Sequence, residues 1–232
     1  MRRICEQEEA LFSEWKSRLL DEEEKKCFVA DGVANEDSYL EISPKILFVL
    51  KEANGKKGEI FPSDFWRELL TKAQRGQTWQ NIARWAYGIR HLPADIPWSG
   101  SLASADDFFR GEILKSIAAI NVKKIYGSHT ADGKKLKVAV KRDGDLLRKQ
   151  IAIYEADFII CCGTRWLLEE AGFPSSKAKW QQTARGVEYC EYEIGKFIVD
   201  YHHPEARCRD YVLYYSLVDA VREMRFKETT VA

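Results

Sequence analysis

The chain has 232 residues, of which 45% are apolar, enough to bury the core of one α/β domain. Its 36 lysines and arginines balance its 36 aspartates and glutamates, so net charge neither requires nor excludes a nucleic-acid partner. No stretch approaches the roughly 18 apolar residues of a membrane span, which argues against a membrane protein.

The start of the chain and the cysteines indicate the compartment. Residues 1–5 run directly into an acidic segment and form no hydrophobic region of a secretion signal, so we expect a cytoplasmic protein. The six cysteines lack the short paired spacings of zinc or iron–sulfur sites. We therefore expect free thiols, no metal and no other cofactor, with Cys161 and Cys162 in the core.

The N-terminal segment is predicted to be helical from about residue 6 to residue 26. Leu11, Trp15 and Leu19 recur there at helical spacing. We expect this helix to pack on the core of a single domain that spans residues 1–232. The apolar run 46–50, which ends in charged residues and glycine, is typical of a buried parallel strand.

Helices and strands alternate along the rest of the chain. Residues 61–87 are rich in tryptophan and predicted to be helical, with breaks at Gly88 and Pro93. Later segments are assigned in the same way: helices over 105–118, 145–154 and 210–224, a strand over 157–163, and a hairpin of 188–193 with 196–200.

Strands separated by helix-length segments predict right-handed crossovers and a mainly parallel central sheet covered on both faces, a three-layer α/β/α sandwich. In such sheets the ligand crevice lies outside the carboxyl ends of the strands. We therefore expect the chemistry to lie just after Leu50, near Asn121, at Gly163 and just after Tyr201.

Two short motifs follow the first and last core strands. The first is Lys51-Glu52-Ala53-Asn54-Gly55, and the second contains His203-Pro204. With the asparagine segment and the glycine-terminated strand between them, these motifs resemble the uracil-DNA glycosylase superfamily in order, over roughly residues 40 to 225. The resemblance implies a uracil-DNA glycosylase-like fold and the hydrolysis of a base–sugar bond in DNA. It makes Glu52 the catalytic carboxylate, turns His203 toward the departing base and lets Asn121 read the base edge.

Physical reasoning supports these roles. Breaking an N-glycosidic bond builds positive charge on the sugar and negative charge on the base. An ionised Glu52 suits the first charge, because it can stabilise the sugar cation and orient water. A hydrogen bond from His203 suits the second charge. Asn121 offers both a donor and an acceptor to a pyrimidine edge.

The expected partner is DNA that contains a modified or damaged base, which must leave the stack to be cleaved. A basic segment over 123–149, with nine basic and three acidic residues, favours such a polymer. The remaining assignments are Asn54, Phe61 and Phe65 to base binding, and Lys51, Lys56, Lys123, Lys124 and Arg207 to the DNA backbone. No obligate protein partner is evident.

Departures from the family pattern affect the expected substrate. Lys51 and Asn54 replace a glycine and a proline of the matched loop, and Glu205 follows His203-Pro204 where the family usually has serine. We therefore expect a specialised member whose base need not be uracil, which makes the anti-phage branch that removes glucosylated cytosines plausible. No lysine is clearly placed as a Schiff-base nucleophile, so we expect a monofunctional enzyme.

Two other function classes stay open. One is a nucleoside or nucleotide N-ribosyl hydrolase, which applies similar chemistry to a small molecule. The other is a non-catalytic DNA-binding module of the same fold. The basic segment 123–149 favours DNA over a free nucleoside, and the presence of Glu52 and His203 argues against an inert module.

Overall fold

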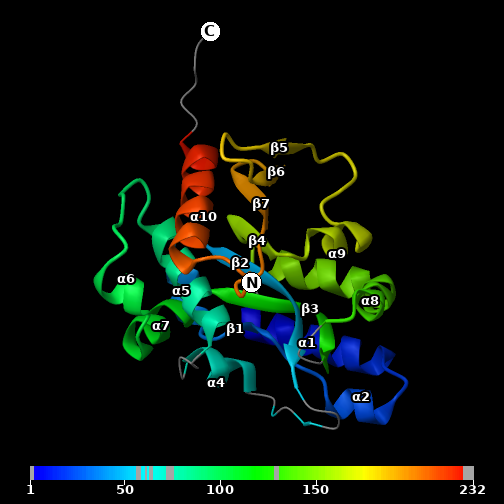
Figure 1. The fold of residues 1–232 in the computed structure, drawn as a ribbon. Coiled ribbons are helices and arrows are strands. Elements are labelled where there is room, and N and C mark those ends of the chain that lie inside the picture. The colour runs from blue at the N-terminus through cyan, green and yellow to red at the C-terminus, as the bar shows by residue number, and fades with distance from the viewer. Residues whose placement is uncertain are drawn as a thin grey trace.

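The computed structural model describes residues 3–55, 59–60, 62, 65–71, 76–127 and 131–226. Within these residues one seven-stranded sheet forms the centre of the molecule, in the order β1-β3-β2-β4-β7-β6-β5 (Figure 1). The strands are β1 Gly32–Val33, β2 Ile46–Asn54, β3 Ala118–Gly127, β4 Phe158–Cys162, β5 Trp180–Gln182, β6 Glu188–Glu193 and β7 Lys196–Tyr201.

The four middle strands, β3, β2, β4 and β7, run parallel to one another. At the two edges β1, β6 and β5 pair antiparallel. The hairpin of β6 and β7 confirms the pairing predicted for 188–193 with 196–200. The parallel middle confirms a mixed α/β fold with a mainly parallel centre.

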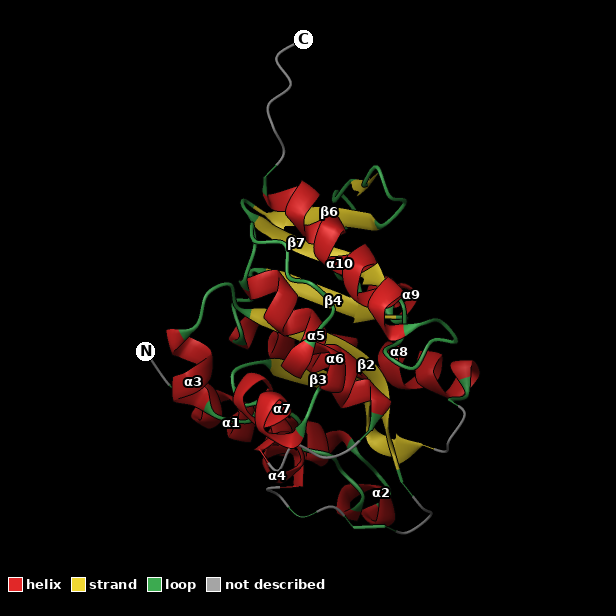
Figure 2. Ribbon diagram, turned by 60° about the vertical axis from the view of Figure 1, so that its left-hand side comes forward, coloured by secondary structure: helices red, strands yellow, loops and turns green. Residues whose placement is uncertain are grey.

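Helices cover both faces of this sheet. In Figure 2, α5, α7 and α10 lie in front of the strands. One face packs against α4 Phe65–Thr71, α5 Gln77–Arg90, α6 Gly100–Ser104, α7 Asp107–Leu114 and α10 Asp210–Arg225. The other face packs against α1 Ile4–Arg18, α3 Glu36–Glu41, α8 Gly133–Ile153 and α9 Arg165–Glu170. This arrangement is compatible with an α/β/α sandwich, and no helix in the described part of the chain is long and apolar enough to cross a bilayer.

The alternation of side chains in β2 divides the core into two halves. Phe48 packs on the side of α5 and α10, whereas Leu47 and Val49 pack on the side of α1 and α8. Both sets are fully buried, which explains why this strand is a continuous apolar run. Cys161 and Cys162 of β4 are buried as predicted.

The predicted helix over 6–26 is wrong in one respect, because the chain forms two helices there. α1 ends at Arg18 and α2 covers Glu22–Lys26. Between them Leu19 has extended backbone, and the Asp21 side chain accepts a hydrogen bond from the backbone of Glu23. An aspartate in this position caps a new helix, so it starts α2 and ends the continuity that the apolar spacing indicated.

Other helix boundaries also move. α5 continues through Gly88 to Arg90. The glycine at this position lets side chains of α10 approach, since a Cβ there would lie 2.6 Å from atoms of Tyr214 and Val218. α8 begins twelve residues before the predicted start at 145, behind the cap of Asp132, whose side chain accepts from the backbone of Lys134. α7 ends at Leu114, and residue 118 already belongs to β3.

Candidate active site

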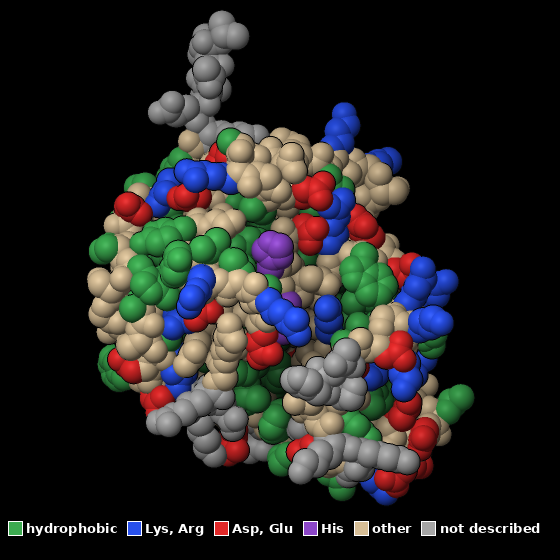
Figure 3. Space-filling view, viewed as in Figure 1, with side chains coloured by type: hydrophobic (Ala, Val, Ile, Leu, Met, Phe, Trp, Pro, Cys, Tyr) green, Lys and Arg blue, Asp and Glu red, His purple; other side chains and the backbone are tan. Residues whose placement is uncertain are grey.

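The chain order of the parallel strands places a switch point between β2 and β4. From β2 the chain crosses to β3 on one side, and from β3 it returns past β2 to β4. Ligands of open α/β sheets bind at such a point, outside the carboxyl ends of the strands. In the space-filling view, histidine side chains lie near the middle of one face, beside lysine or arginine and acidic side chains (Figure 3).

Gly163 brings the ends of β2, β4 and β7 together. Its backbone N–H donates to the carbonyl of Tyr201 at 2.8 Å. Its φ of +69° lies in the left-handed region, which favours glycine. A Cβ on Gly163 would lie 3.8 Å from both the backbone nitrogen of His203 and Cε of Lys51. Lys51 and His203 therefore converge on this glycine.

The His203 imidazole is partly buried beside a positive charge. Burial is the main cause that lowers its pKa, and the ammonium of Lys51 lowers it further, while Glu205 acts in the opposite direction. Nδ1 of His203 accepts a hydrogen bond from the backbone of Glu205 at 3.2 Å. In the neutral ring the proton then resides on Nε2, which leaves Nε2–H as a donor for a ligand.

A buried asparagine of α5 anchors the loop that carries His203. Asn81 is fully buried, and its amide donates to the carbonyl of Pro204 at 2.8 Å and to Asp210 at 3.0 Å. Its own oxygen accepts from Arg84 at 2.9 Å. Sequence reasoning missed Asn81, because one asparagine in an amphipathic helix resembles an ordinary polar position. Only its contact 123 residues along the chain gives it this role.

Glu52, at the end of β2, pairs with Lys123 of β3. Oε2 of Glu52 lies 2.5 Å from Nζ of Lys123, in a charge-assisted hydrogen bond between side chains that are 6% and 16% exposed. Lys123 also donates to the carbonyl of Tyr126 at 3.1 Å. A Cβ on Gly127 would collide with the Glu52 carboxyl group, so glycine makes the space that this group occupies.

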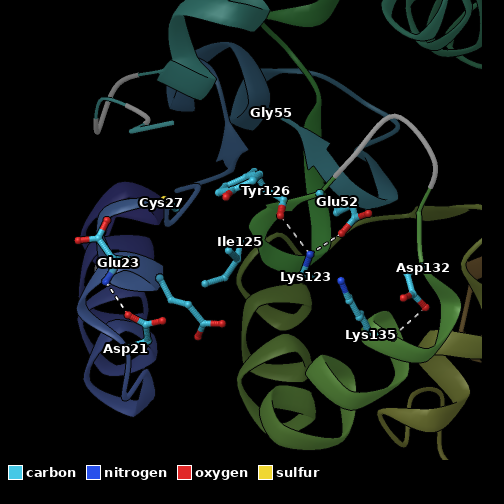
Figure 4. Close-up of a pocket in the computed structure, with 12 residues that line it drawn as sticks. Asp21, Glu23, Cys27, Glu52, Gly55, Lys123, Ile125, Tyr126, Asp132 and Lys135 are labelled. Atoms are coloured by element: carbon cyan, nitrogen blue, oxygen red, sulfur yellow. Dashed lines mark hydrogen bonds and ion pairs between the residues drawn. The ribbon is translucent and has the colours of Figure 1, made fainter. Parts of the chain in front are cut away.

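This ion pair lies on the wall of a cavity of about 640 Å³, within the size range of ligand sites. Its described lining comes from α2, the ends of β2 and β3, and the start of α8. The lining comprises Asp21, Glu23, Glu24, Cys27, Glu52, Gly55, Lys123, Ile125, Tyr126, Gly127, Asp132 and Lys135. Figure 4 shows the α2 residues on one side of the cavity and the ion pair on the other. The α2 side is acidic.

The structure groups the two predicted catalytic residues with different partners. Consecutive strand residues point to opposite faces, so Lys51 and Glu52 diverge at the end of β2. Lys51 lies beside His203, and Glu52 contacts Lys123. β4 separates β2 from β7, so these strands are about 10 Å apart, twice the spacing of neighbours. Glu52 and His203 therefore lie at the same edge of the sheet, but the structure does not bring them into one cavity, because His203 is not among the described residues that line the Glu52 cavity.

Asn121 and Lys124 require a correction, because both are held inside the core by Asp31. Asn121 is 1% exposed, and its amide donates to the Asp31 carboxylate at 3.1 Å. The Lys124 ammonium lies 2.6 Å from the same carboxylate and 5.0 Å from the Trp15 ring centroid. Burial lowers the pKa of Lys124, and Asp31 opposes this effect. Neither side chain is placed to read a base or bind phosphate.

The other predicted contacts are spread along the edge. Asn54 is exposed at the end of β2, and Phe65 of α4 is partly buried against the core. Arg207 is exposed and lines a separate hollow of about 300 Å³ with His202 and the start of α10. Phe61 and Lys56 lie outside the described residues.

No protein-family model matches this sequence. A search of curated proteins also finds no match.

Proposed function

We propose that the protein is a monofunctional DNA glycosylase, which hydrolyses the bond between an aberrant or modified base and its sugar and leaves an abasic site. The observation that carries the proposal is the carboxylate of Glu52, fixed by Lys123 on the wall of a large cavity at the carboxyl ends of β2 and β3. The order of motifs along the chain, which resembles the uracil-DNA glycosylase superfamily, supports the same activity.

The proposal requires the base–sugar bond to lie between Glu52 and His203, whose side chains suit the two charges of the reaction. Glu52 stabilises the positive charge that develops on the sugar and orients the attacking water. Nε2–H of His203 donates to the base as it becomes anionic. Lys51, first expected to contact the DNA backbone, lies beside His203, and its ammonium adds to the stabilisation of the departing base. Removing one such donor typically costs about 10²–10³ in rate.

The cavity favours a bulky base over unmodified uracil. Three carboxylates line the cavity opposite Glu52, those of Asp21, which caps α2, and of Glu23 and Glu24 within α2. Carboxylates accept hydrogen bonds from hydroxyl groups. A modified cytosine that carries a hydroxyl-rich substituent, such as a glucosylated base of viral DNA, therefore fits the proposal best. An anti-phage role in the cytoplasm is part of this proposal.

The acidic α2 wall also favours a second candidate, a nucleoside N-ribosyl hydrolase. Lys26 pairs with Glu23 and Arg142 lies 3.7 Å from Glu24, but Asp21 adds a further carboxylate to this wall. Such a wall disfavours phosphate groups, whereas a free nucleoside carries none. The same bond would break by the same chemistry, with Glu52 and His203 in unchanged roles. The DNA glycosylase and the nucleoside hydrolase therefore differ in substrate, which is a DNA strand for the first and a single nucleoside for the second.

One experiment tests both. The protein is incubated with oligonucleotides that carry uracil, hypoxanthine, hydroxymethylcytosine or glucosylated cytosine, and in parallel with the free nucleosides. Abasic sites are then cleaved with alkali. We expect alkali-dependent breaks with at least one base, no breaks without alkali, and their loss in Glu52→Gln and His203→Asn. Release of bases from nucleosides alone would establish the second candidate, and breaks that persist in both variants would refute the roles of both residues.

A further inference from the structure

Trp166 is an exposed tryptophan at the edge where the candidate site lies. It belongs to α9, which begins immediately after Gly163 and Thr164, and it is 43% exposed. By contrast, Trp15 and Trp85 are fully buried in the core. An exposed indole is available for contact with a flat ligand.

Two lysines lie near Trp166 at the start of α8, behind the capping carboxylate of Asp132. The Thr164 hydroxyl donates to the carbonyl of Val49 at 2.9 Å, which ties the start of α9 to β2. Cη2 of the indole lies 3.8 Å from the position that a Cβ on Gly133 would take, so the ring lies near the start of α8. The next two residues of α8, Lys134 and Lys135, are exposed, and Lys135 lines the Glu52 cavity.

We propose that Trp166 stacks on a nucleobase that neighbours the excised nucleotide, while Lys134 and Lys135 contact the phosphates of that strand. An aromatic ring next to basic side chains is the arrangement by which proteins hold single-stranded nucleic acid irrespective of sequence. The acidic side chains of α2 lie across the cavity and repel phosphate, so the strand follows α8 and α9. The inference rests on the proposed function for its ligand, DNA.

Binding is measured without any cleavage, by fluorescence anisotropy of a labelled single-stranded oligonucleotide that lacks modified bases. We expect Trp166→Ala to weaken binding about tenfold, which corresponds to about 1.4 kcal/mol and lies within the range for one stacked base. Trp166→Phe should retain most of the affinity. The control is Phe108→Ala, an 81% exposed aromatic of α7, which should bind like the wild type.

Salt dependence gives a second, independent measurement. Replacing Lys134 and Lys135 together by glutamine should reduce the slope of log affinity against log salt by about 1.4, since each phosphate contact on a single strand contributes about 0.7. Wild-type binding in Trp166→Ala together with an unchanged slope would overturn the inference. The two proposals can fail separately. If the variants bind DNA more weakly but the wild-type protein excises no base, the role of Trp166 stands and the glycosylase proposal is refuted.

Discussion

The Glu52 carboxylate lies 2.5 Å from the ammonium of Lys123, in space that Gly127 leaves free. Three residues from the ends of two neighbouring strands thus fix one carboxylate on the wall of a cavity. The arrangement depends on the irregular register that follows the pairing of Glu52 with Lys123, after which Asn54 pairs with Gly127. Between these two pairs β3 has two more residues than β2.

Substituting Gly127 tests whether the position of this carboxylate matters. Gly127→Ala places a methyl group where the Glu52 carboxyl group now lies, so we expect the carboxylate to move and base excision to fall by at least tenfold. Single-turnover cleavage of the best substrate measures the effect. Gly76→Ala is the matched control, because among the described residues its Cβ would come no closer than 4.0 Å, to an atom of Trp79. Equal rates in both variants would contradict the assigned role of Glu52.

Lys51 should control the protonation of His203. Burial and the Lys51 charge both lower the pKa of His203, so Lys51→Gln should raise it toward its ordinary value of 6.5. Titration of the imidazole by NMR measures the change. Lys115→Gln removes a charge near the amino end of β3 and should leave the titration unchanged. If the pKa of His203 is the same in Lys51→Gln as in the wild type, the charge of Lys51 does not act on the His203 imidazole.

The lowered pKa also has a consequence for stability. As pH falls below 6.5, unfolded chains take up a proton at His203 before folded chains do. The free energy of unfolding therefore decreases as the pH is lowered below 6.5. Above 6.5 this loss is absent, because His203 is neutral in both the folded and the unfolded state. His203→Asn should lack this contribution, so the change in the free energy of unfolding from pH 5.5 to pH 7.5, measured by urea unfolding, should be less positive in the variant than in the wild type.

Asn81 should act as a positioning residue for the loop of His203. Asn81→Ala removes its hydrogen bonds to Pro204 and Asp210, so we expect unfolding to become easier by about 1–3 kcal/mol. It should also lower kcat with little change in KM, because the loop holds a group needed in the transition state. Gln80→Ala, the neighbouring position of α5, is the control. A loss of stability with an unaltered kcat would limit Asn81 to a structural role.

Glu8 of α1 should make stability depend on pH near neutrality. Burial raises its pKa to about 7, against an ordinary value of 4.5, although hydrogen bonds from Val33 and Tyr154 oppose the rise. Between these values the folded state holds a proton that the unfolded state has released. The free energy of unfolding therefore decreases as pH rises from 4.5 to 7, by about 3 kcal/mol at most.

Glu8→Gln stays neutral at every pH and should escape this loss. Relative to the wild type, its free energy of unfolding should increase from pH 5 to pH 8, measured by urea titration. Glu9→Gln, an exposed position of the same helix, should follow the wild type at both values. A difference between Glu8→Gln and the wild type that does not vary with pH would show that Glu8 is ionised in the fold throughout.

Local patterns were enough to predict the framework of the fold. The strands over 46–50 and 157–163 are apolar runs. A strand of a parallel sheet is covered on both faces, so all of its side chains have to be apolar. The hairpin before the last helix was equally local. Because parallel strands align their carboxyl ends, the same patterns placed Glu52 and His203 at one edge without any knowledge of their contacts.

The contacts of the polar side chains depend on partners that are distant in sequence. The sequence by itself determined which residues end the core strands, since strand period and apolarity are local properties. Only the tertiary structure decided that Asp31 holds Lys124, 93 residues away, inside the core, and that Lys51 and Glu52 part at the end of β2. A charged side chain is buried or exposed according to the partner that folding brings to it, and no local pattern carries that information.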